Sequence, residues 1–361
     1  MKLTDIANIR LLSQQIESTK FKAAKDLVKW MGAMQAQDYY MAKWAIGVRL
    51  PGSTERQIQT AIDKGQIIRT HLLRPTWHFV SPEDIYWMLE LTAPQIKASS
   101  KSRDKQLELT EKIYTKSNSI IQKALRDGKH LTREELMAEL AKAKIATDNN
   151  RSSHLLLRAE LEAIICSGAA KGKNRTYALL ENVVPETTPL SKDEALSKLA
   201  KKYFSSHCPA TLQDFIWWSG LSVVNAKHAL EIIKPDFISE TINSQTFWLT
   251  NSFSIPATAG KSCYLLPAYD EFMISYKDRN ASLNFEGQKK SISINGIFNP
   301  IIVINGQVTG LWKRIIKSDR VIVETEFFRA HNKTELNLIK KASVLFGHFL
   351  EKKIEISHMT N

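Results

Sequence analysis

The sequence has little of what marks secreted, membrane-spanning or disulfide-linked proteins. Its 361 residues include only three cysteines, Cys166, Cys208 and Cys263, which stand far apart and form no CxxC pair. That spacing excludes a disulfide framework and a zinc knuckle, and it is typical of reduced thiols in the cytosol. After Met1–Ala7 there is no apolar segment followed by a small-residue cleavage site, as a secretory signal would have. No apolar run approaches the roughly 18 residues that a membrane span needs. We therefore expect a cytoplasmic protein that does not engage a membrane.

Signatures of the common enzyme classes are also missing. The sequence contains no HExxH, GxSxG or GxGxxG motif, and its nine histidines show no spacing suited to a metal ion. We therefore expect neither a metal site nor a small-molecule cofactor.

Acidic residues are in short supply relative to basic ones. The chain has 50 Lys and Arg against 37 Asp and Glu, which gives a formal charge of +13 and a pI near 9.5. Such an excess favours a polyanionic partner, either nucleic acid or an acidic membrane surface, and the alternative is a basic surface that serves only solubility. A membrane surface fits poorly because no basic amphipathic helix with Trp or Phe on its other face is evident. Double-stranded DNA is the partner that we predict.

One pattern of short helices followed by a hairpin occurs three times along the first two-thirds of the chain. Helix starts are marked by a capping residue with an acid or amide three places on. A helix, a turn, a second helix and then a hairpin form a winged helix. The three copies contain, in order, the helix Thr54–Ile62 with the hairpin Ile67–Val80, the helix Ser153–Glu162 with the basic hairpin Gly168–Leu179, and the helix-turn-helix from Ala210 with Gly220 in its turn.

The last hundred residues change to strand-like runs with turn signals. The Asn305-Gly306 pair between apolar runs predicts a type I′ hairpin, and a helix is predicted over Lys333–Phe349. We predict an α+β fold of three tandem winged-helix units followed by a small C-terminal β-barrel or curled sheet. The predicted boundaries are 1–82, 83–185, 186–258 and 259–361.

Several segments resemble the AlkZ-like winged-helix DNA glycosylases, in order over nearly the whole chain. They are Gln35–Asp38, Arg69–His78, Leu266–Arg279, Asn295–Pro300 and Gly310–Arg314. The resemblance implies three winged helices and a barrel, and an enzyme that excises alkylated bases or unhooks DNA cross-links. The alternative is a winged-helix protein that binds DNA without catalysis, as a regulator or an architectural factor.

The resemblance implies a catalytic role for Gln35 and Gln37, which flank Ala36. Residues two apart on a helix point roughly 200° away from each other, whereas in an extended break they face the same way. Asp38 is placed to cap a following helix and so to create such a break. Two carboxamides can accept from a water and donate to a leaving group, which suits a cationic N7- or N3-alkylpurine because an amide is no strong base. The alternative is that both glutamines only satisfy helix ends.

No lysine is assigned as a Schiff-base nucleophile, so we expect a monofunctional glycosylase. Basic residues on the first two hairpins are predicted to contact DNA phosphates, and two histidines are predicted to face DNA. Asp270, Glu271 and Asp278 form an acidic cluster, in which Asp270 is a candidate for stabilising the cationic sugar. The alternative for this cluster is salt bridging to Lys277, Arg279 or Arg314. We expect a monomer that associates with the nucleoid. The predicted DNA-binding residues are Arg69, His71, Arg74, His78, Lys171, Lys173 and Arg175.

Overall fold

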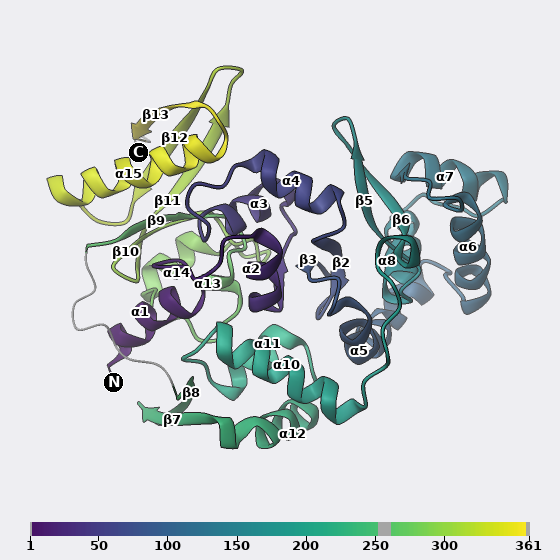
Figure 1. The fold of residues 1–361 in the computed structure, drawn as a ribbon, viewed down its shortest axis with the longest axis horizontal. Coiled ribbons are helices and arrows are strands. Elements are labelled where there is room, and N and C mark those ends of the chain that lie inside the picture. Colours follow the sequence, from purple (N-terminus) through teal and green to yellow (C-terminus); the bar gives the residue numbers. More distant parts are fainter. Residues whose placement is uncertain (1, 252–260, 359–361) are drawn as a thin grey trace.

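The chain combines repeated helix-and-hairpin units with a curled five-stranded sheet near its C-terminal end (Figure 1). The structure is a computed structural model that describes residues 2–251 and 261–358. The predicted α+β class is confirmed. The predicted boundary at 258/259 lies outside the described residues.

The same order of elements, helix, short strand, two helices and a two-stranded hairpin, occurs three times. In the third unit an isolated bridge between Ala210 and Trp248 takes the place of the short strand. The first unit consists of α2 (Ala24–Met31), β1 (Ala33–Gln35), α3 (Tyr39–Gly47), α4 (Glu55–Asp63), β2 (Ile68–Leu72) and β3 (Thr76–Val80). The second consists of α6 (Glu111–Ala124), β4 (Leu131–Thr132), α7 (Arg133–Lys142), α8 (Arg151–Leu161), β5 (Ile165–Lys171) and β6 (Asn174–Leu179). The third consists of α10 (Lys192–Ser206), α11 (Leu212–Ser219), α12 (Val223–Ile233), β7 (Phe237–Ile242) and β8 (Gln245–Thr250). The chain also contains α1 (Leu3–Ser13), α5 (Ile85–Gln106) and α9 (Leu180–Val183).

Four predicted helix starts, each a capping residue with an acid or amide three places on, are confirmed: Thr54, Thr132, Ser191 and Thr211 each close a capping box. The start predicted at Ser81 and Pro82 is wrong, because α5 begins at Ile85. Each cap satisfies backbone N–H groups that the helix leaves unpaired, which is worth about 1 kcal/mol. The sequence therefore fixes where these helices begin through contacts within three residues.

The C-terminal sheet has the strand order β13-β12-β11-β10-β9, with β13 parallel to β12 and the other neighbours antiparallel. Asn305 and Gly306 have φ of 50° and 76°, as the predicted type I′ turn requires. The closing helix α15 spans Lys333–Phe349, as predicted. The remaining elements are β9 (Cys263–Leu266), α13 (Glu271–Ile274), α14 (Phe285–Ser291), β10 (Ile301–Ile304), β11 (Gln307–Ile316), β12 (Arg320–Phe327) and β13 (Lys353–His358).

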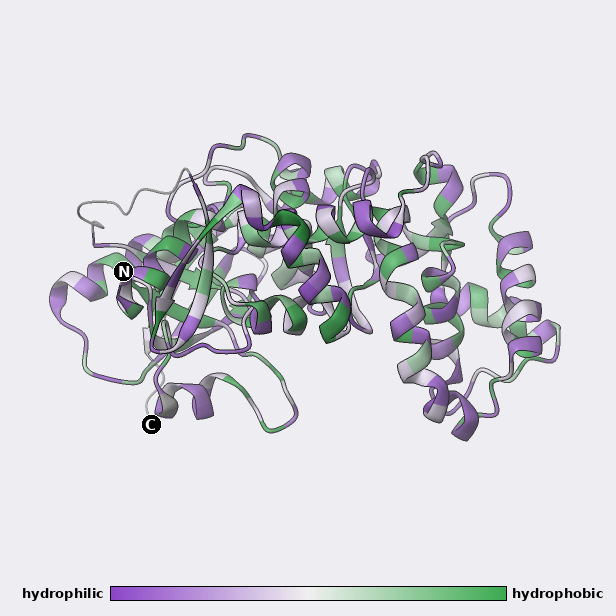
Figure 2. Cartoon of the chain, turned by 90° about the horizontal axis from the view of Figure 1, so that it is seen from below, coloured by the Kyte–Doolittle hydropathy of each residue, from purple (hydrophilic) through white to green (hydrophobic). Residues whose placement is uncertain are grey.

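The first unit and the C-terminal sheet share one hydrophobic core. The indole of Trp44 in α3 donates to the carbonyl of Leu265 at 2.7 Å and packs 5.0 Å from the ring of Phe346. Helices α3 and α15 meet at Gly47, where a Cβ would come within 2.5 Å of Phe349. The third unit shares a core with α5, whereas the second unit has its own core. The second unit lies at the right-hand end of the long axis, where α6, α7 and α8 are labelled in Figure 1 and which Figure 2 shows from below. Among the described residues, no helix is long and apolar enough to cross a bilayer.

Candidate active site

The segment from Ala33 to Asp38 forms an extended break between α2 and α3. Gly32, with φ of 77°, ends α2, and β1 then pairs with β3 so that Gln35 lies opposite His78. The carboxylate of Asp38 accepts from the N–H groups of Tyr40 and Met41, both at 3.1 Å, and so caps α3. The predicted break and its cap are confirmed.

The two glutamines of this segment have different surroundings. Gln35 is buried, and its Oε1 accepts from Nη2 of Arg74 at 3.2 Å. Its backbone N–H donates to Oε1 of Glu271 at 2.6 Å. Gln37 is exposed, and its side chain makes no hydrogen bond within the described part of the chain. One amide is thus held by the protein and the other is free to meet a ligand.

Glu271 is a site residue to which the sequence gave no role of its own, beyond its place in the acidic cluster with Asp270 and Asp278. It is buried and also accepts from the Ser275 hydroxyl and, at 3.2 Å, from the Trp218 indole. Burial opposes its ionisation, but the His207 ring 3.5 Å away, the Ser275 hydroxyl and the Gln35 N–H hold the pKa of Glu271 at about 2. Its carboxylate is therefore ionised at neutral pH. The sequence signals for it were its place in this cluster and in the segment Leu266–Arg279 that resembles the family.

Asp270 forms a buried ion pair with Arg49. Both of its oxygens accept from the guanidinium at 2.8 Å, and neither side chain is exposed. Asp270 also caps α13 through the N–H of Phe272 at 2.9 Å. A carboxylate that is fully buried and neutralised by an arginine presents no oxygen to a sugar at the surface, so its placement does not support the predicted role in stabilising the cationic sugar.

A basic cavity of about 350 Å³ lies between the hairpins of the first and second units. Arg69 lines it and donates to the carbonyl of Ala36 at 3.0 Å, while the Ala36 N–H donates to the carbonyl of Trp77 at 2.7 Å. The cavity therefore begins beside the glutamine segment. Burial and the charge of Arg175 lower the pKa of Arg69 to about 10, so Arg69 is still a cation at neutral pH. The lining residues are Tyr40, Arg69, Trp77, Arg133, Glu134, Ser167, Lys173, Asn174, Arg175, Thr176 and Tyr177.

Arg69, Lys173 and Arg175, all predicted to bind DNA, thus meet at one cavity, although they come from two units. Lys171 is exposed on the same hairpin and pairs with Glu135 at 2.9 Å. His71 bonds to the buried Glu160 of α8 and connects the first unit to the second.

His78 lies in the interior, with about 1% of its surface exposed, and its Nδ1–H donates to the carbonyl of Thr76 at 2.9 Å. A buried ring presents no surface to a phosphate, so its placement does not support the predicted DNA contact. Burial and the nearby charge of Arg74 lower the pKa of His78 from 6.5 to about 3. The folded protein therefore keeps this ring neutral over a range of pH in which the unfolded chain protonates it.

His78→Asn should reduce the acid sensitivity of folding. Between the unfolded pKa of 6.5 and the folded pKa of about 3, the unfolded state binds more protons, so stability falls as the pH falls. Between pH 6.5 and about pH 4.5 this one group should cost the wild type about 2 kcal/mol. Urea unfolding at both pH values measures the difference, and equal pH dependence in the two proteins would contradict it.

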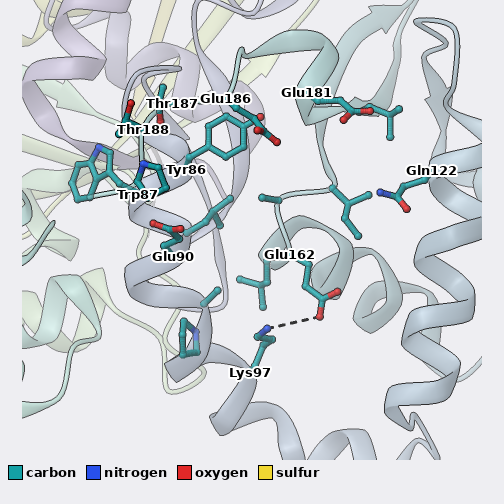
Figure 3. Close-up of a pocket in the computed structure, with 18 residues that line it drawn as sticks. Tyr86, Trp87, Glu90, Lys97, Gln122, Glu162, Glu181, Glu186, Thr187 and Thr188 are labelled. Atoms are coloured by element: carbon teal, nitrogen blue, oxygen red, sulfur yellow. Dashed lines mark ion pairs between the residues drawn. The ribbon is translucent and has the colours of Figure 1, made fainter. Parts of the chain in front are cut away.

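A second cavity, of about 550 Å³, lies between α5, the end of α8 and the chain that precedes α10 (Figure 3). Its lining includes Glu90, Glu162, Glu181 and Glu186, and Glu162 pairs with Lys97 at 3.8 Å and with Arg158 at 2.7 Å. The two cavities share no lining residue, and an acidic lining repels phosphate. No cluster of metal-binding side chains occurs in residues 2–251 and 261–358.

Comparisons with known proteins agree with this architecture. The family model described as DNA glycosylase AlkZ-like matches residues 28–349. The solved structure of Streptomyces sahachiroi DNA glycosylase AlkZ is similar to this chain with a TM-score of 0.82 and 18% sequence identity, covering 99% of both chains. No curated protein matches the chain.

Proposed function

The chain belongs to the AlkZ-like family of DNA glycosylases, and from this premise we propose that it releases cationic N7- or N3-alkylpurines, or cross-linked bases, from duplex DNA. Gln35 and Gln37 position the water that attacks the sugar. The observation that carries the proposal is the extended segment, which presents an exposed amide beside a cavity lined by Arg69, Lys173 and Arg175.

The chemistry suits these side chains. A cationic base needs no protonation before it leaves, so a group that holds water in place is sufficient and a strong base is unnecessary. With no lysine assigned as a covalent nucleophile, the reaction ends at an abasic site with the strand intact. The first and second units of one chain together line the basic cavity, so the proposed active form is a monomer. We place its activity in the cytoplasm, on the DNA of the nucleoid.

The three repeated units are winged helices in this proposal, over 1–82, 83–185 and 186–258, and 259–361 forms the C-terminal sheet region. The order of helix, short strand, two helices and hairpin supports this interpretation. The hairpin β5–β6 then acts as a wing that holds the DNA backbone.

Lys173→Ala and Arg175→Ala should each weaken duplex binding about equally for all sequences. Each cation that neutralises a phosphate releases counterions, so each substitution should reduce the slope of log affinity against log salt by about one. Fluorescence anisotropy over a salt series measures this slope, and Lys340→Ala on α15 is a matched control. A loss confined to certain sequences would instead indicate a base contact.

A base-release assay tests the proposed reaction. Excess protein is incubated with a duplex that carries a single N7-methylguanine, and free base is measured together with strand breaks before and after hot alkali. We expect free base and alkali-dependent scission. Scission without alkali would contradict a monofunctional reaction, and bound duplex with no base released would contradict this substrate class.

A further inference from the structure

We propose that Arg74 and Glu271 give the two amides different roles, fixing Gln35 as a hydrogen-bond donor and leaving Gln37 as the acceptor that holds the attacking water. This inference rests on the proposed function. It adds two positioning residues that act through Gln35, and it assigns a direction to each hydrogen bond in the reaction.

The contact with Arg74 determines which end of the Gln35 amide is free. A guanidinium carries only donors, so the group of Gln35 that faces Nη2 at 3.2 Å must be the oxygen. The NH₂ group then becomes the polar end that can reach a ligand. Arg74 is half-buried and belongs to the tight turn after β2, where its own N–H donates to the carbonyl of Leu72 at 2.7 Å. The partner of Gln35 is therefore itself held in place.

Glu271 fixes the backbone of the same residue. Its Oε1 accepts from the N–H of Gln35 at 2.6 Å, while its Oε2 is held by Trp218 at 3.2 Å and by Ser275. The carboxylate belongs to α13, so a residue of the C-terminal region sets the position of a residue in β1. Its negative charge also offsets the charge of Arg74, which would otherwise oppose a cationic sugar nearby.

Gln37 has none of these constraints. Its side chain is exposed and makes no hydrogen bond to the described residues, although its backbone position is set by the capped start of α3. An amide oxygen can accept from water without changing its charge. Gln37 is thus the amide that is free to orient a water toward the sugar.

The reaction balances with these roles. The C1′–N9 bond breaks and its electron pair stays with the purine, which leaves as a neutral base. A lone pair of the water oxygen forms the new bond to C1′, and the released proton passes to solvent. Gln35 donates to the departing nucleoside, and Gln37 accepts from the attacking water.

The isosteric variants Gln35→Glu and Gln37→Glu distinguish the roles. Both keep the shape of the side chain and add the same negative charge near DNA, but a carboxylate at neutral pH can only accept. Under single-turnover conditions with saturating protein, Gln35→Glu should lose about 100-fold in rate, as for the loss of one positioned donor. Gln37→Glu keeps the acceptor oxygen, so its rate of base release should fall by no more than about tenfold. The uncharged variant Gln35→Met should lose about as much of the rate as Gln35→Glu. It controls for the possibility that the charge added in Gln35→Glu slows the reaction by disturbing the fold.

The role of Arg74 has its own readout. Arg74→Met should slow base release in the otherwise unchanged protein, and it should cause no further loss in the Gln35→Met background, because a residue that acts through Gln35 has no effect once that amide is gone. A purely structural role would give additive losses. Equal losses in the two Glu variants, or a larger loss at Gln37, would overturn the division of roles while leaving the glutamine pair catalytic. Full activity in both Glu variants would instead remove the pair from the proposed function.

Discussion

Replacing Gln35 and Gln37 together by alanine should slow the single-turnover release of N7-methylguanine by at least about a thousandfold. Positioning of a reactant and a single well-aimed donor each contribute on the order of 10² or more, and their removal together leaves only binding of the duplex. The two effects need not add, because the amides act on one reacting centre. Duplex affinity should change little, since Gln37 carries no charge and Gln35 is buried.

This result is measured by the base-release assay with saturating protein, alongside binding to the same duplex. Gln66→Ala is a matched control, because Gln66 is an exposed glutamine of the first unit just beyond α4. The control should keep the wild-type rate. If the double variant released base as fast as the control, the glutamine segment would have no part in the reaction.

Asp270→Ala should destabilise the protein by about 3–5 kcal/mol. The substitution leaves the guanidinium of Arg49 buried without its carboxylate, and an uncompensated buried charge is among the most costly defects in a protein interior. The remaining partners of Arg49 are the carbonyls of Ala45 and Gln14 and the side-chain oxygen of Gln14, which do not replace a full negative charge. Urea unfolding at neutral pH measures the change.

A double variant separates the charge from the packing. Arg49→Met with Asp270→Leu removes both charges and keeps apolar volume, so it should recover a large part of the lost stability. At a temperature where the wild type and the Asp270→Ala variant are both folded, the variant should release base at close to the wild-type rate. If the Asp270→Ala protein were stable but released base a hundredfold more slowly, that result would support the role predicted from the sequence, in which Asp270 stabilises the cationic sugar.

Much of the fold was predictable because it depends on neighbours in the sequence. The capping boxes, the turn at Asn305-Gly306 and the helix at Lys333–Phe349 each depend on residues only a few positions apart. The extended break at the glutamines is also local, because Gly32 ends one helix and Asp38 starts the next. The positive net charge and the resemblance of several segments were likewise properties of the chain alone.

The sequence by itself determined the order of the elements, the place of the glutamine segment and the basic character of the hairpins. Only the tertiary structure decided what the polar side chains of the candidate site contact beyond their neighbours in the sequence. Glu271 bonds to a residue 236 positions away, and Asp270 pairs with one 221 positions away. His78 was assigned to the surface but is buried between β1 and β2, because a strand residue faces solvent or core according to what packs on it. Such partners come from distant segments that share no local pattern, so spacing along the chain carries no record of them.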